Sequence, residues 1–118
     1  MNRHRNLKVW QLAGELIDKV YQLTRQLPVE ERFVATSQMR RAAWSVQNNI
    51  AEGYAKRGVG ELRRFFDSSL ASLAEVDSMS AKLADLYAIE PTIVDAIEMK
   101  RRAITKLLFD ILRRRGGA

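Results

Sequence analysis

The segment 36-TSQMRRAAWSVQNNIAEGY-54 carries the most information about the fold of this 118-residue chain. Its apolar residues recur at intervals of three and four, the period of an α-helix with one buried face. These residues are Met39, Ala42, Ala43, Val46, Ile50 and Tyr54. The segment therefore predicts an amphipathic helix that packs its apolar stripe against other helices.

Polar side chains lie on or beside the same stripe, at Gln38, Asn49 and Glu52. A buried polar group costs free energy unless it finds a hydrogen-bonding partner. We therefore expect a structural network of the acids nearest the core, Glu52, Glu75 and Asp77. Their expected partners are Arg40, Arg41, Arg63 and Arg64. The predicted members of this buried polar network are Gln38, Arg41, Asn49, Glu52, Glu75 and Asp77.

The helical period extends over the whole chain and predicts helices at about residues 7–27, 29–56, 60–88 and 92–115. Pro28 separates the first two, and Pro91 suits the first turn of the last. No segment alternates with the period of a strand. Four amphipathic helices with short connections predict one all-α domain over residues 1–118, an antiparallel up-down-up-down four-helix bundle. A break in the second helix near Thr36 stays open, and residues 1–6 and 116–118 are expected to be mobile.

Composition limits the classes of function. There is no cysteine, which excludes disulfides, thiol catalysis and zinc fingers and fits a reducing compartment. No apolar run approaches the length of a membrane span, so we expect a cytoplasmic protein without a membrane partner. Lys and Arg number 20 against 14 Asp and Glu, a net charge of +6. Such an excess attracts polyanions such as RNA or DNA, although it also serves solubility alone.

Basic residues cluster near the chain ends and near the second turn. In an up-down bundle these three places share one end, because alternate helices run in opposite directions. Few aromatic residues accompany the cations, so any binding should follow the phosphate backbone with little sequence preference. The alternative is solvated charge near helix ends. The candidate nucleic-acid-binding residues are Arg3, Arg5, Lys56, Arg57, Arg113, Arg114 and Arg115.

A second apolar stripe lies on the outer side of the second and third helices. At about 100° per residue, Phe33, Trp44 and Ala51 point away from Val46. Exposed apolar patches often mark protein interfaces, whereas single exposed aromatics are ordinary on a monomer. The stripe predicts a homo-oligomer whose candidate interface residues are Phe33, Trp44, Ala51, Met79 and Leu86.

The sequence offers little material for catalysis. His4 is the only histidine, the Glu-x-x-His motifs of di-iron bundles are missing, and no phosphate-binding loop is present. We therefore predict no catalytic residue, no metal site and no cofactor. A hydrolase with a metal held by carboxylates alone stays as a remote alternative.

Several short motifs occur together between residues 5 and 90. They are Leu7-Lys-Val-Trp-Gln11, Pro28-x-x-Glu31-Arg-Phe33, Ser37-Gln-Met-Arg-Arg-Ala-Ala43, Asn49-Ile-Ala-Glu-Gly53, Glu61-x-x-Arg-Phe65 and Ser72-Leu-Ala-Glu75. In these motifs the chain resembles the bacterial four-helix-bundle proteins known from intervening sequences of 23S ribosomal RNA genes. The resemblance implies a ring-like homopentamer. It also implies kinship with the bundle-shaped accessory proteins of diversity-generating retroelements, which bind a reverse transcriptase and nucleic acid.

One position departs from this resemblance. Gln47 stands where the family often has proline, which restores a backbone donor and predicts a straighter second helix. Taken together, the sequence predicts a non-enzymatic, self-assembling binding or scaffold protein that contacts nucleic acid or a nucleic-acid-associated protein. The alternative is a purely structural oligomer.

Overall fold

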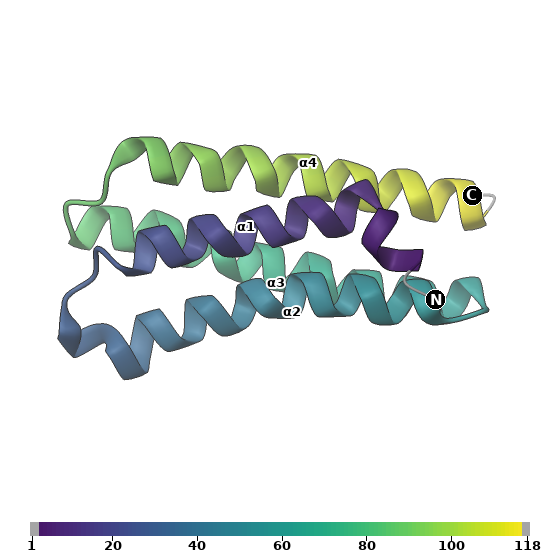
Figure 1. The fold of residues 1–118 in the computed structure, drawn as a ribbon, viewed down its shortest axis with the longest axis horizontal. Helices are drawn as coiled ribbons and strands as arrows, with labels where there is room; N and C mark the ends of the chain where they lie inside the picture. The colour runs from purple at the N-terminus through teal and green to yellow at the C-terminus, as the bar shows by residue number, and fades with distance from the viewer. Residues whose placement is uncertain (1–2, 117–118) are drawn as a thin grey trace.

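Four long helices run side by side in alternating directions in the computed structural model, which describes residues 3–116 (Figure 1). They are α1 (Lys8–Thr24), α2 (Ser37–Ala55), α3 (Val59–Leu86) and α4 (Pro91–Gly116). The bundle measures 45 × 23 × 21 Å, and residues 3–116 contain no strand. The predicted all-α four-helix bundle is confirmed. None of the helices within these residues is both long and apolar enough to cross a membrane.

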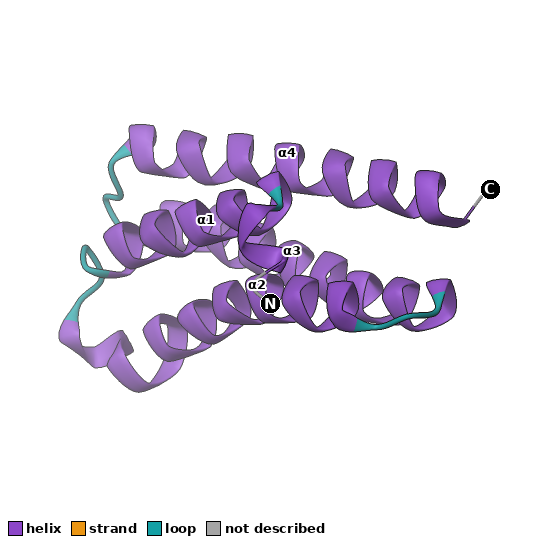
Figure 2. Ribbon diagram, turned by 45° about the vertical axis from the view of Figure 1, so that its right-hand side comes forward, coloured by secondary structure: helices purple, strands orange, loops and turns teal. Residues whose placement is uncertain are grey.

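Three short helical pieces supplement the bundle. Arg3–Asn6 forms a 3₁₀ helix, η1, where the sequence predicted a mobile terminus. The side-chain amide of Gln11 donates to the Arg5 carbonyl at 2.9 Å and ties η1 to α1. Figure 1 and Figure 2 show η1 turning from the start of α1 toward α2, with which it is also in contact. Residues 1–2 and 117–118, which belonged to the expected mobile ends and to the predicted domain, lie outside the described residues.

The segment before α2 changes helical type twice. Val29–Glu31 forms a 3₁₀ helix, η2, and Arg32–Thr36 forms a π-helical stretch, η3, before α2 begins at Ser37. The possible break near Thr36 is thus a real boundary, and the predicted continuous helix over 29–56 is wrong at its start. A π-helical turn changes the angular spacing of side chains along the helix. Here Ala35 is buried while Phe33 and Val34 face outward.

Two helices end earlier than the sequence predicted. α1 ends at Thr24, three residues before the predicted bound, and α3 ends at Leu86, two residues before it. After Thr24, the amides of Gln26 and Leu27 bond carbonyls three residues earlier, which tightens the chain into a turn before Pro28. α3 ends at Leu86 because Tyr87 has an extended backbone, with φ −131° and ψ 159°. The hydroxyl of Tyr87 donates to a carboxylate oxygen of Glu31 and joins the end of α3 to η2.

The core runs along the bundle axis and receives side chains from all four helices. The predicted stripe of α2 is buried from Met39 to Ile50, and Phe66 of α3 is the largest fully buried side chain. α2 and α3 approach each other closely at Gly53. A Cβ built on Gly53 would lie 2.9 Å from the Cβ of Phe65, so this position needs glycine for lack of space.

Candidate nucleic-acid interface

One end of the bundle collects most of the predicted basic residues. η1, the turn between α2 and α3, and the end of α4 all lie there, at the right of Figure 1. We call it the basic end. The predicted residues that are exposed there are Arg5, Lys56, Arg57, Arg113, Arg114 and Arg115. Arg3 lies in η1, but its side chain is outside the described part of the structure.

A hollow of about 420 Å³ opens at the basic end, and we call it the basic hollow. It brings together residues from η1, the last turn of α2, the α2–α3 turn and the last turn of α4. Three predicted residues line it, Lys56, Arg57 and Arg115, whereas Arg5, Arg113 and Arg114 do not. The other lining residues within the described chain are His4, Ala51, Tyr54 and Ala55.

The cations of the basic hollow are not neutralised by the rest of the described chain. Among residues 3–116, no carboxylate forms an ion pair with Lys56, Arg57 or Arg115. Lys56 instead places its ammonium 5.3 Å from the centre of the Phe65 ring, a favourable cation–π arrangement. The hollow therefore concentrates uncompensated positive charge.

Basic residues along α4 are in a different situation, because acids neutralise them. Lys100 pairs with Glu15 of α1 at 2.8 Å, and Lys106 pairs with Asp110 at 3.3 Å. Arg113, one of the predicted binding residues, also pairs with Asp110. Hydrogen bonds from Lys106 and then Arg113 lower the pKa of the Asp110 carboxyl. Within the described part of α4, Arg114 and Arg115 form no ion pair, so the unpaired charge of its last turn lies at the basic end.

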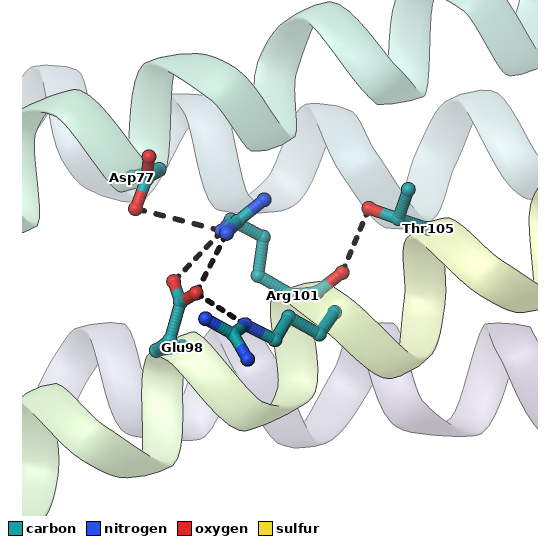
Figure 3. A network of polar contacts seen from close by, with 5 residues as sticks. Asp77, Glu98, Arg101 and Thr105 are labelled. Atoms are coloured by element: carbon teal, nitrogen blue, oxygen red, sulfur yellow. Dashed lines mark hydrogen bonds and ion pairs between the residues drawn. The ribbon is translucent and has the colours of Figure 1, made fainter.

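The densest polar network joins α3 to α4 (Figure 3). Arg101 donates to both carboxylate oxygens of Glu98, at 3.0 and 2.7 Å, and lies 3.5 Å from Asp77. Arg102 donates to Glu98 at 2.7 Å. Hydrogen bonds from Arg101 and then Arg102 lower the pKa of Glu98 to about 2. This network positions helices and lies away from the basic hollow.

The predicted buried polar network is wrong in its burial. Gln38, Arg41, Glu52 and Asp77 are exposed in the single chain. Gln38 donates to Glu75 at 2.8 Å, so that pair does link α2 and α3, but at the surface. Asn49 donates to the carbonyl and hydroxyl of Ser45, within its own helix. Other polar residues are buried within the described chain. They are Thr24, Ser69 and Ser80, which carry short hydroxyl side chains, and Gln47, which carries an amide.

Sequence reasoning missed Ser69 and Gln47. Ser69 donates to the Val46 carbonyl at 2.9 Å, between α3 and α2. Its spacing of three and four from Phe66 and Leu73 was a usable signal for burial. Gln47 is only 8% exposed, although the sequence marked it only as a departure from proline.

The candidate interface residues separate into two groups. Phe33, Leu86 and Trp44 are 86%, 56% and 45% exposed, as an outward apolar stripe requires. Met79 is partly buried and packs against the core, so it does not face outward. Ala51 is partly buried and lines the basic hollow.

Phe33 borders a shallow groove of about 470 Å³ between the η3–α2 segment and α3. Gln38, Arg41 and Glu75, which belong to the predicted buried polar network, also line it, whereas Asn49, Glu52 and Asp77 do not. Within residues 3–116, no group of three or more histidine, aspartate or glutamate side chains is placed to hold a metal ion.

Comparison with known proteins agrees with the motifs of the sequence. A family model described as 23S rRNA-intervening sequence protein matches residues 5–110, most of the chain. The match confirms the resemblance to this family. A search of curated proteins found no match.

Proposed function

We propose that this chain, which belongs to the 23S rRNA-intervening sequence protein family, is a non-enzymatic, self-assembling protein whose basic end binds the phosphate backbone of nucleic acid. The observation that carries the proposal is a set of three cations gathered around one hollow, Lys56, Arg57 and Arg115, which form no ion pair within residues 3–116. We place this role in the cytoplasm, where RNA and DNA are both accessible partners.

Backbone contact accounts for the chemistry of the basic end. Lysine and arginine neutralise phosphates and release condensed counterions, which gives affinity that falls with salt. Such contacts carry no direct information about the base sequence. Binding should therefore differ little between unrelated RNAs.

Self-assembly is supported by the outward apolar side chains. Phe33 lies in η3 and Leu86 ends α3, so both are at the end of the bundle opposite the basic end (Figure 1). Large exposed apolar groups favour burial against a partner. We propose the homopentamer that the family resemblance implies. An interface built on this far end leaves the basic hollow of every subunit accessible, which raises the avidity for a long polyanion.

The test is fluorescence anisotropy with two unrelated labelled RNAs and one duplex DNA over a salt series. The triple variant Lys56→Ala, Arg57→Ala, Arg115→Ala should weaken binding about equally for all three ligands. Its salt slope should flatten by about one unit for each phosphate that the variant no longer neutralises.

A matched control removes three cations from the other end, through Arg25→Ala, Arg32→Ala and Lys82→Ala. These side chains are exposed, and the control has the same net charge as the test variant. Its affinity should stay close to that of the wild type. If both triple variants lose the same affinity, the net charge of the protein and not the basic hollow explains the binding. No binding even at low salt would favour the purely structural oligomer.

A further inference from the structure

We infer that the basic hollow is a receptor for a single phosphomonoester on a nucleoside, the chemistry found at the phosphorylated end of an RNA strand and in a free nucleoside monophosphate. The inference deepens the proposed function and rests on it, because it names the part of a nucleic acid that the basic end recognises.

The first argument is shape. The hollow is bordered by η1, the last turn of α2 with the turn that follows it, and the last turn of α4, three segments distant in sequence. Its volume of about 420 Å³ lies within the range of about 300–1,000 Å³ for small-molecule pockets. A strand bound along its length needs instead a groove that tracks several successive nucleotides. The hollow therefore suits one terminal unit.

The second argument is charge. Among residues 3–116, the side chains that line it include Lys56, Arg57 and Arg115 and no carboxylate. A phosphomonoester carries a charge of about −1.5 to −2 at neutral pH, whereas an internal phosphodiester carries one negative charge. Arginine also binds a terminal phosphate through two parallel N–H donors. Three uncompensated cations thus favour the phosphomonoester.

The third argument is the composition of the remaining wall. Ala51 and Ala55 contribute only methyl groups, and Tyr54 lines the hollow between them. Small side chains leave room for a flat base, and an aromatic ring offers a surface against which bases pack. His4 adds a ring N–H, and its imidazole lies 5.4 Å from the Trp10 ring, edge to face. The cations and the apolar wall together match a phosphate attached to a nucleoside.

The end of α2, which forms one wall of the hollow, is already packed against α3. Lys56 rests over Phe65, and Gly53 lets the end of α2 approach Phe65 closely. A site already in its binding geometry loses less entropy when a ligand binds.

The experiment compares two labelled single-stranded RNAs of one sequence that differ only in a 5′-phosphate or a 5′-hydroxyl. With the full chain at moderate salt, we expect the phosphorylated RNA to bind on the order of tenfold more tightly, the scale of one additional charge-assisted contact. Ala55→Leu, which fills the hollow without changing charge, should make the two affinities equal. Ala81→Leu, at an exposed position of α3, is the matched control and should keep the preference.

A second measurement does not need RNA. The chain has two tryptophans, so Trp44→Phe leaves Trp10, beside His4, as the only tryptophan. Its fluorescence should respond saturably to a nucleoside monophosphate and far less to the nucleoside or to inorganic phosphate.

The outcomes separate this inference from the proposed function. Equal binding of both RNAs, with no response to the mononucleotide, overturns the inference and leaves backbone binding intact. If the tryptophan fluorescence responds to the mononucleotide but no RNA binds, the inferred phosphomonoester site is supported and the proposed binding of nucleic acid is contradicted. An equal response to inorganic phosphate overturns the nucleoside part, and no binding of any probe overturns both proposals.

Discussion

The side-chain amide of Gln47 in α2 donates a 3.1 Å hydrogen bond to the backbone carbonyl of Trp10 in α1. Gly14 makes room for this contact, because a Cβ built there would lie 2.9 Å from Nε2 of Gln47. A buried amide without a partner costs about 1–3 kcal/mol, so the two positions should be energetically coupled.

A double-mutant cycle measures this coupling. Alanine in place of glycine inside a helix stabilises by about 0.8–1.0 kcal/mol. When Gln47 is present, however, the new Cβ of Gly14→Ala displaces its amide and breaks the hydrogen bond. This loss of about 0.5–1.5 kcal/mol offsets the stabilisation that alanine gives to the helix. Gly14→Ala should therefore be nearly neutral alone and stabilising by about 1 kcal/mol in a Gln47→Ala background. Urea unfolding measures the free energy of unfolding of the wild type, the two single variants and the double variant. If the effects of the two substitutions are additive, the two positions are not coupled through this hydrogen bond.

Gly53 offers a second packing prediction with an internal control. Gly53→Ala places a Cβ 2.9 Å from the Cβ of Phe65, an atom fixed to the backbone of α3. The two helices must move apart, which costs about 1–3 kcal/mol of unfolding free energy. Gly60→Ala has open space around its Cβ and should be neutral or slightly stabilising. Similar effects of both substitutions on the urea midpoint would contradict the close approach.

Gly14 and Gly53 illustrate which features of this structure can be predicted from the sequence and which cannot. The apolar period located all four helices because burial repeats every three to four residues. The π-helical stretch and the role of Gly14 left no such trace, since they depend on which helix lies opposite. The pair of Arg113 with Asp110 is different, because it lies within α4 at a spacing of three residues that the sequence already showed. Asp77 lies 3.5 Å from Arg101 of α4 and not beside the expected arginines, because the helical period does not show which face of α4 lies against α3.

Asn49 should contribute less stability than its position beside the stripe suggested. Its amide bonds Ser45 of the same helix, and it is the Ser45 hydroxyl that reaches Ser72 of α3, at 2.9 Å. Asn49→Leu leaves the Ser45–Ser72 contact in place and should cost under about 1 kcal/mol. Ser45→Ala removes the hydroxyl that both neighbours contact and should cost more. A larger loss of stability for Asn49→Leu in urea unfolding would reverse this ranking.

Glu98 makes stability depend on pH in the acid range. Its pKa is lowered from 4.5 to about 2, so its contribution is complete above about pH 4.5 and is lost as the pH falls through about 2. Because the network is partly exposed, Glu98→Gln should cost only up to about 1 kcal/mol at neutral pH. The difference between wild type and variant should shrink toward zero near pH 2. Urea unfolding over that range checks this, and a constant difference would assign the effect to packing.

Assembly provides the last prediction, and Phe33 is the sharpest residue for it. Phe33 is 86% exposed, so Phe33→Glu leaves the fold of a single chain nearly unchanged. Trp44→Glu also disturbs the chain itself, because the Trp44 ring N–H donates to the Tyr21 hydroxyl at 3.1 Å. If these side chains form the subunit interface, an unpaired carboxylate buried there costs several kcal/mol and dissociates the oligomer. Met99→Glu on α4, at a position 72% exposed, is the matched control and should keep the wild-type mass. Size-exclusion chromatography with light scattering reports the masses. A wild type that is monomeric, or a Phe33→Glu protein with the mass of the wild-type oligomer, would remove the interface from this face.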